Sequence, residues 1–125
     1  MSINFNQLSE INRNLKKHPK CSLLIVSKNR DPETIKLLIN EGYLYFGENR
    51  VQEAEKKFES FEKMPDIQRR FIGHLQSNKC KKLVSAVPNL FMVETVDGAK
   101  LARKLNAAAA AAGRDDLRIL VQVNT

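Results

Sequence analysis

Short apolar runs alternate along this chain with longer segments whose apolar residues recur every three or four positions. The four aliphatic residues 23–26 lack polar alternation, which favours a strand buried on both faces, as in a parallel sheet. Helical spacing in the longer segments predicts amphipathic helices. The predicted strands are 22–28, 43–48, 71–75, 90–96 and 118–125, and the predicted helices are 4–17, 31–42, 51–61, 77–84 and 97–113.

Residues that favour helix ends stand at several of these boundaries. Asp31 followed by Pro32 is typical of a helix start, and Asp97 is expected to cap the last helix. Gly42 and Gly113 stand where the preceding helices are expected to end. These signals divide the chain into one leading helix followed by alternating strands and helices.

The third full-length helix is expected to carry charged pairs on its solvent side. Glu53 with Lys57, and Glu59 with Lys63, are oppositely charged residues four positions apart. That spacing places two side chains next to each other on a helix surface.

The resulting order, α(βα)₄β, predicts an α/β fold with a parallel sheet and right-handed crossovers. Two architectures fit this pattern equally well. One is an open doubly wound sheet, and the other is the first part of an eight-fold (β/α)8 TIM-type barrel. No glycine-rich nucleotide-binding fingerprint follows any predicted strand.

Length and composition indicate one ordinary globular domain. The chain has 125 residues, of which 42% are hydrophobic and 28% are charged. No apolar run approaches the ~20 residues of a membrane helix, and the N-terminus does not resemble a secretory signal. Cys21 and Cys80 fit neither a disulfide framework nor a zinc site, so we expect two reduced thiols in a cytoplasmic protein.

The formal net charge of +7 suits a phosphate-bearing partner, either nucleic acid or a small anion. Basic residues are scattered, however, and a solvated surface is the simpler interpretation. The densest basic stretch consists of Arg69, Arg70, Lys79, Lys81 and Lys82.

Polar residues follow the predicted strands, at the edge where parallel α/β folds place their ligand sites. Lys28 is the strongest candidate, because an amine at the end of a buried strand is partly desolvated. Desolvation lowers the pKa of a lysine and favours the neutral amine that forms an imine with an aldehyde. The alternative is a lysine that simply extends into water. The other candidates are Glu48, Asn49, Arg50, His74, Ser77, Lys79, Glu94, Asp97 and Asn124.

Simple structural roles compete with function at most of these positions. Asn49 and Ser77 could be helix caps, and Arg50 could be a solvated charge. His74 has no nucleophile arranged with it in a known motif, which favours a hydrogen-bonded structural histidine. Ser77 and Lys79, at a helix start, could also bind a phosphate.

Five segments resemble, in the same order, the pyridoxal phosphate homeostasis family. They are 25–28 (IVSK), 46–54 (FGENRVQEA), 71–79 (FIGHLQSNK), 93–97 (VETVD) and 121–125 (VQVNT). The resemblance implies a fold-type III barrel similar to the N-terminal domain of alanine racemase. It also implies pyridoxal 5'-phosphate (PLP) held as a Schiff base on Lys28, with Asn49 beside the cofactor ring.

The family is regarded as a carrier or buffer of PLP that supports vitamin B6 and amino-acid homeostasis without established catalysis. The resemblance therefore implies a non-enzyme that could serve PLP-dependent apo-enzymes. Glu48, Arg50, His74, Ser77, Lys79 and Asn124 are the second-shell candidates under this interpretation.

This sequence is about half as long as the family's members. It would form a single domain, residues 1–125, that contains the N-terminal helix and the first five barrel strands. The family's phosphate-binding segments and the arginine near the pyridine nitrogen lie beyond the matched part. An incomplete barrel leaves an unpaired strand edge, so association into oligomers is one expectation.

Two other function classes remain as alternatives. A PLP enzyme of the same fold, such as a racemase, needs a second acid/base, and Tyr43 and Tyr45 lie at the start of their strand. A basic nucleic-acid-binding module would need a stacking platform, and the chain has no tryptophan.

Overall fold

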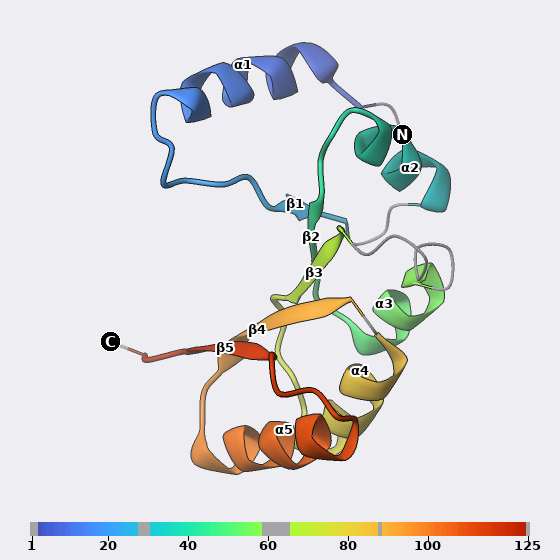
Figure 1. The fold of residues 1–125 in the computed structure, drawn as a ribbon, viewed down its shortest axis with the longest axis vertical. Helices are drawn as coiled ribbons and strands as arrows, with labels where there is room; N and C mark the ends of the chain where they lie inside the picture. Colours follow the sequence, from blue (N-terminus) through green and yellow to red (C-terminus); the bar gives the residue numbers. More distant parts are fainter. Residues whose placement is uncertain (1–2, 28–30, 59–65, 88, 125) are drawn as a thin grey trace.

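The computed structural model describes residues 3–27, 31–58, 66–87 and 89–124 (Figure 1). No helix in those ranges is long and apolar enough to cross a membrane. The helices are α1 (Phe5–Lys16), α2 (Pro32–Asn40), α3 (Val51–Phe58), the 3-10 helix η1 (Ser77–Lys79), α4 (Cys80–Ala86) and α5 (Ala99–Ala111). The strands are β1 (Ile25–Val26), β2 (Tyr45–Glu48), β3 (Gln68–Phe71), β4 (Leu90–Val96) and β5 (Arg118–Val121).

The five strands form one parallel sheet in the order β1-β2-β3-β4-β5. The prediction of a parallel α/β sheet in sequence order is confirmed. The doubly wound alternative is contradicted in its 2-1-3-4-5 form, because β1 pairs only with β2 in the described sheet. β1 therefore forms one edge of this sheet and β5 the other.

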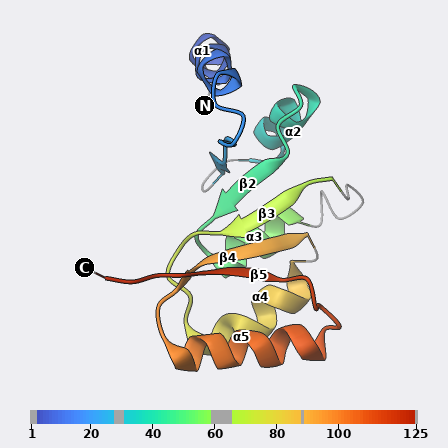
Figure 2. The same cartoon turned by 60° about the vertical axis from the view of Figure 1, so that its left-hand side comes forward.

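The two faces of the sheet differ in what covers them. Helices α3, α4 and α5 pack on one face, as Figure 2 shows, and no such layer of described residues covers the opposite face. The strand register gives each face its own row of aligned residues. The row on the covered face is Ile25, Phe46, Arg69 and Leu90, and the row on the open face is Val26, Gly47, Arg70, Met92 and Arg118.

Two apolar clusters fill the covered side. The larger one joins β3 and β4 to α4 and α5 through side chains such as Phe71, Leu83, Val93 and Leu105. The smaller one consists of Ile35, Leu38, Phe46 and Ile67, with Ile3 and Leu8 packed against it. No residue of α1 is fully buried, so the first helix lies outside the sheet with one partly covered stripe, as expected.

β3 begins at Gln68, whereas the sequence pattern placed this strand at 71–75. The charged residues Arg69 and Arg70 concealed the strand, because they interrupt the apolar run that marks the others. Pairing with β2 in the register Phe46↔Arg69 and Glu48↔Phe71 fixes the observed position.

The predicted N-terminal cap of α2 is confirmed, and the predicted N-terminal cap of α5 is wrong. The side chain of Asp31 accepts a hydrogen bond from the Thr34 amide at 2.8 Å, and the bonds to Thr34 lower the pKa of Asp31. Asp97 does not cap α5, because Gly98 occupies the N-cap position without a side-chain bond.

The carboxyl ends of β2 and β3 approach each other very closely. The Ile72 amide donates to the Glu48 carbonyl at 2.8 Å, and Thr95 Oγ1 donates to the Gly73 carbonyl at 2.6 Å. A Cβ added at Gly73 would lie 2.6 Å from Asn49 Cβ and 2.7 Å from Asn49 Cα. Only glycine fits here, because backbone rather than a flexible side chain occupies the space.

We expect Gly73→Ala to lower the free energy of unfolding by about 2 kcal/mol, since relieving the clash requires the two strand ends to separate. Gly98→Ala is the matched control, because a Cβ there meets nothing within 4 Å. That variant should stay within about 0.5 kcal/mol of the parent. Urea unfolding of both proteins measures the difference, and equal stability of the two variants would contradict the close-packing argument.

Both cysteines are free, as predicted, and they lie in opposite environments. Cys21 is exposed, whereas Cys80 is buried in the larger apolar cluster at the start of α4. Burial raises the pKa of the Cys80 thiol, which reduces the fraction of reactive thiolate at a given pH.

A chromogenic thiol reagent should therefore titrate one cysteine rapidly in the native protein and two after denaturation. Cys21→Ser should abolish the rapid phase, because the buried Cys80 reacts only when the fold opens. Rapid reaction of two thiols in the native parent would show that Cys80 is accessible.

Candidate functional site

A pocket of about 390 Å³ lies at the carboxyl ends of β2 and β3. One wall is the start of α3, and the other is the segment between β3 and α4. The pocket brings together four of the residues singled out in the sequence. Its lining consists of Asn49, Arg50, Val51, Gln52, Phe71, His74, Leu75, Gln76 and Lys79.

Asn49 has an unusual environment within this pocket. Its side-chain oxygen is buried, and no described residue donates a hydrogen bond to it. The helix-cap interpretation of Asn49 is therefore wrong, since a capping side chain would accept a bond from α3. A buried acceptor without a donor is costly, and such a group at a pocket wall suits the polar edge of a ligand.

Three basic residues accompany Asn49. Arg50 and His74 are exposed and Lys79 is half-buried. The prediction of a hydrogen-bonded structural histidine at position 74 is not supported, because His74 lies at the pocket surface. This arrangement gives the pocket a positively charged rim that favours anionic ligands.

The remaining sequence candidates lie elsewhere. Ser77 begins η1, but Gln76 holds the N-cap position and no side-chain cap bond forms, so the capping role is wrong. Asn124 is exposed and contacts Gln122 Nε2 at 3.4 Å, away from the pocket lining. Lys28 falls outside the described residues.

Glu48 is the centre of a buried ionic cluster beneath the sheet. Its Oε1 accepts from Ser27 Oγ at 2.5 Å and lies 3.3 Å from Arg69 Nη2 and 3.5 Å from Lys57 Nζ. Lys57 also pairs with Glu53 at 2.8 Å and donates to the Ser27 carbonyl. Burial lowers the pKa of Arg69, and the Glu48 carboxylate opposes that shift.

Sequence reasoning missed the burial of Lys57 and Arg69. Lys57 was assigned to the solvent side of its helix, yet only 6% of it is exposed. A signal was present for Arg69, because it alternates with Ile67 and Phe71, which face the core. The second pair assigned to that surface, Glu59 with Lys63, lies outside the described residues.

The other densely basic residues do not form a continuous surface. Arg70 stacks on Tyr45 and Phe91, with its guanidinium carbon 5.7 Å and 5.5 Å from the two ring centroids. Arg118 lies 5.0 Å from the Phe91 centroid. Arg69 is therefore in the core and Arg70 on the open face, whereas the three lysines of the stretch lie on η1 and α4.

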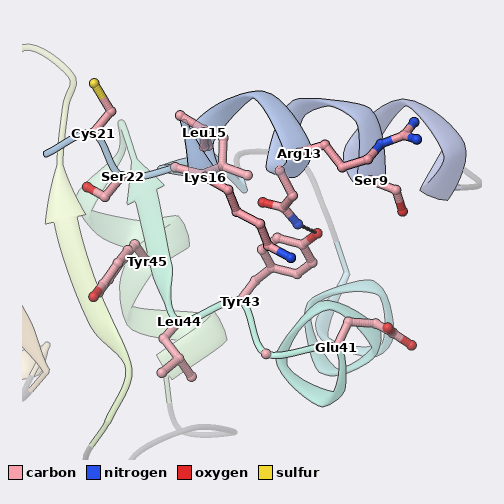
Figure 3. Close-up of a pocket in the computed structure, with 13 residues that line it drawn as sticks. Ser9, Arg13, Leu15, Lys16, Cys21, Ser22, Glu41, Tyr43, Leu44 and Tyr45 are labelled. Carbon is pink, nitrogen blue, oxygen red and sulfur yellow. Dashed lines mark hydrogen bonds between the residues drawn. The ribbon is translucent and has the colours of Figure 1, made fainter. Parts of the chain in front are cut away.

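A larger pocket, of about 620 Å³, lies at the opposite ends of the strands (Figure 3). It is bounded by α1 and by the segment that leads into β2, with Arg13, Tyr43 and Tyr45 in its lining. Asn12 Nδ2 donates to Tyr43 Oη across it. None of the candidate residues from the strand ends lines this pocket, so size alone does not identify the functional site.

The chain is similar in sequence to proteins of one name in several organisms. No protein-family model matches the chain. The pyridoxal phosphate homeostasis protein of Schizosaccharomyces pombe is 47% identical over 104 residues, which cover 82% of this chain and 42% of that protein. The human protein of the same name is 42% identical over 107 residues, covering 82% of this chain and 38% of its own length.

Solved structures extend the similarity to the fold. PipY of Synechococcus elongatus PCC7942 with PLP bound has a TM-score of 0.70 and 37% identity, over 85% of this chain and 50% of PipY. The structure of PipY without PLP has a TM-score of 0.76 and 34% identity, over 94% of this chain and 54% of PipY. The chain spans about two fifths of the length of the two curated relatives. In sequence and in its parallel α/β fold, the chain is therefore similar to part of the pyridoxal phosphate homeostasis proteins and of PipY.

Proposed function

We propose that this chain binds PLP for intracellular PLP and amino-acid homeostasis, with Lys28 as the covalent anchor and Asn49 as a ring contact. The observation that carries the proposal is the buried, unpartnered oxygen of Asn49 in a pocket with a basic rim. The similarity to PipY, which was solved with PLP bound, supports the choice of ligand.

Lys28 supplies the chemistry that the pocket residues lack. Its amine condenses with the PLP aldehyde, releasing water and leaving a Schiff base that is reversible in water. Lys28 directly follows Ser27, which the buried ionic cluster holds at the end of β1. This neighbourhood supports Lys28 over a lysine on a solvated helix.

The pocket residues complement the anchor. Asn49 can accept a hydrogen bond from a ring substituent, and Gly73 keeps the Asn49 backbone in place. Arg50 and Lys79 favour an anionic ligand electrostatically, and His74 lies beside them in the lining. Ser77, Glu48 and Asn124 do not line the pocket, so any part they play is indirect.

We further propose that the five strands form part of an eight-stranded TIM-type barrel, with residues 1–125 as one domain. The parallel sequence-order sheet and the helices on one face are what this architecture requires. Exposed apolar residues on the edge strand β5, including Ile119 and Val121, favour further association, including oligomers. Two free cysteines agree with a cytoplasmic location.

A non-catalytic carrier role is favoured over a racemase. Tyr43 is engaged by Asn12 at the amino ends of the strands, and Tyr45 stacks with Arg70 on the open face. Neither lines the candidate pocket, so neither is placed as a second acid/base there. PLP-dependent apo-enzymes are the proposed recipients of the cofactor. Burial of Arg69 weighs against a nucleic-acid-binding surface.

The central test is Lys28→Ala in the full chain. The parent should show a visible absorbance band with PLP and a pyridoxyl adduct after borohydride reduction, and the variant should show neither. Unfolding free energy should change by less than about 1 kcal/mol, because a strand-end lysine contributes little packing.

Lys79→Ala is the matched control, since Lys79 is the lysine that lines the described pocket. It should retain the adduct on Lys28. Mass spectrometry that places the pyridoxyl group on Lys79 or another lysine would refute the assignment of the anchor.

We expect Asn49→Ala to weaken PLP binding about tenfold while leaving the reduced adduct on Lys28. The substitution removes a ring contact, worth roughly 1–2 kcal/mol, but not the amine. Titration of the visible band measures the change, and Gln52→Ala at the same pocket wall serves as the control. Unchanged affinity in Asn49→Ala would exclude Asn49 as a ring contact.

A further inference from the structure

Every backbone and side-chain polar group of Ser27 is held by neighbouring elements. Its amide donates to the Gly47 carbonyl at 3.0 Å, and its hydroxyl donates to Glu48 Oε1 at 2.5 Å. Its carbonyl accepts from Lys57 Nζ, which comes from the last turn of α3. Ser27 is 1% exposed, so water does not compete for these bonds.

β1 has little else to fix its carboxyl end. The strand is two residues long, lies at the sheet edge and pairs only with β2, through Ile25 and Val26. Val26 is 47% exposed, so its side chain adds little packing. Among the contacts of the described residues, the polar cluster therefore provides the restraint beyond Val26.

The ionic cluster contributes more to the orientation of Ser27 than to the free energy of unfolding. Glu48, Glu53, Lys57 and Arg69 balance in formal charge, and Arg69 also donates to the Ala54 carbonyl at 3.4 Å. Buried ion pairs of this kind are often no more stabilising than apolar side chains of similar size. An apolar side chain, however, could not donate to the Ser27 carbonyl or accept from its hydroxyl.

We propose that Lys57 and Glu48 are positioning residues, which fix Ser27 and so restrain the chain immediately before Lys28, the residue proposed to react with the PLP aldehyde. The proposal rests on the proposed function, in which Lys28 is the anchor. Neither residue lines the candidate pocket, so both act through Ser27 rather than by touching the ligand. Their contribution is to imine formation, which depends on amine geometry, and not to binding of the ring and phosphate.

Lys57→Met removes the donor to Ser27 and keeps a long side chain beneath the sheet. Lys56→Met is the matched control, because Lys56 is the adjacent residue on α3 and is exposed. Each variant is titrated with PLP and with pyridoxine phosphate, which carries an alcohol in place of the aldehyde. Thermal unfolding establishes that both variants are folded.

We expect Lys57→Met to weaken PLP binding and slow adduct formation roughly tenfold to a hundredfold, while its affinity for pyridoxine phosphate stays within about twofold. Lys56→Met should match the parent for both ligands. If Lys57 were merely structural, its replacement would weaken the binding of both ligands, and that result would overturn the proposal. PLP binding equal to that of Lys56→Met would also overturn it.

Ser27→Ala provides a second test if Lys57→Met does not fold, because it removes only the hydroxyl, which bonds to Glu48 Oε1 at 2.5 Å and to the Gly47 carbonyl at 3.3 Å. Ser27→Ala should also weaken binding of PLP but not of pyridoxine phosphate. If PLP binding is not weakened selectively, the proposal is overturned. Failure of the proposed function looks different, because the unmutated chain would then form no adduct on Lys28. If the parent forms the adduct on Lys28 but the variants do not weaken PLP binding selectively, only the positioning role is refuted.

Discussion

The carboxylate of Glu48 connects three strands and one helix at a single buried point. Through one oxygen it meets Ser27 beyond β1, Arg69 on β3 and Lys57 on α3. Removing Lys57 or Arg69 would leave buried negative charge in excess, which is more costly than the intact cluster. The relative placement of β1, β2, β3 and α3 therefore depends on these contacts together.

The two pockets illustrate why chemistry identifies a site better than volume. The larger one lies between α1 and the start of β2, where Asn12 and Tyr43 already satisfy each other. The smaller one contains the unpartnered oxygen of Asn49 and a rim of basic side chains. Parallel sheets place their ligand sites at the carboxyl ends of the strands, and only the smaller pocket lies there.

Sequence periodicity predicted the parallel sheet and the bounds 90–96 of β4, because that strand is apolar and bounded by turn residues. The periodicity left two strand orders open, and the family resemblance favoured the sequential order that is observed. It also gathered Asn49, Arg50, His74 and Lys79 at one edge, since strand ends converge in such a sheet. It misplaced β3 and the side chains of Lys57 and Arg69, because a charged residue is expected to be exposed until its partners are known. Those partners come from other elements, so only the tertiary structure reveals them.

The open face of the sheet poses a separate physical problem from the site. Parallel sheets normally have both faces covered, and here Arg70 and Arg118 stack on aromatic rings across the face that lacks helices. Such stacking shields part of the aromatic surface without a second layer. The Glu48 cluster lies instead beneath the helix-covered face, and the pocket is walled by α3 and the segment before α4. The carboxyl end of β1 is therefore held by contacts among the described residues, whatever covers the open face. That separation is why binding of the aldehyde can be tested in this chain by itself.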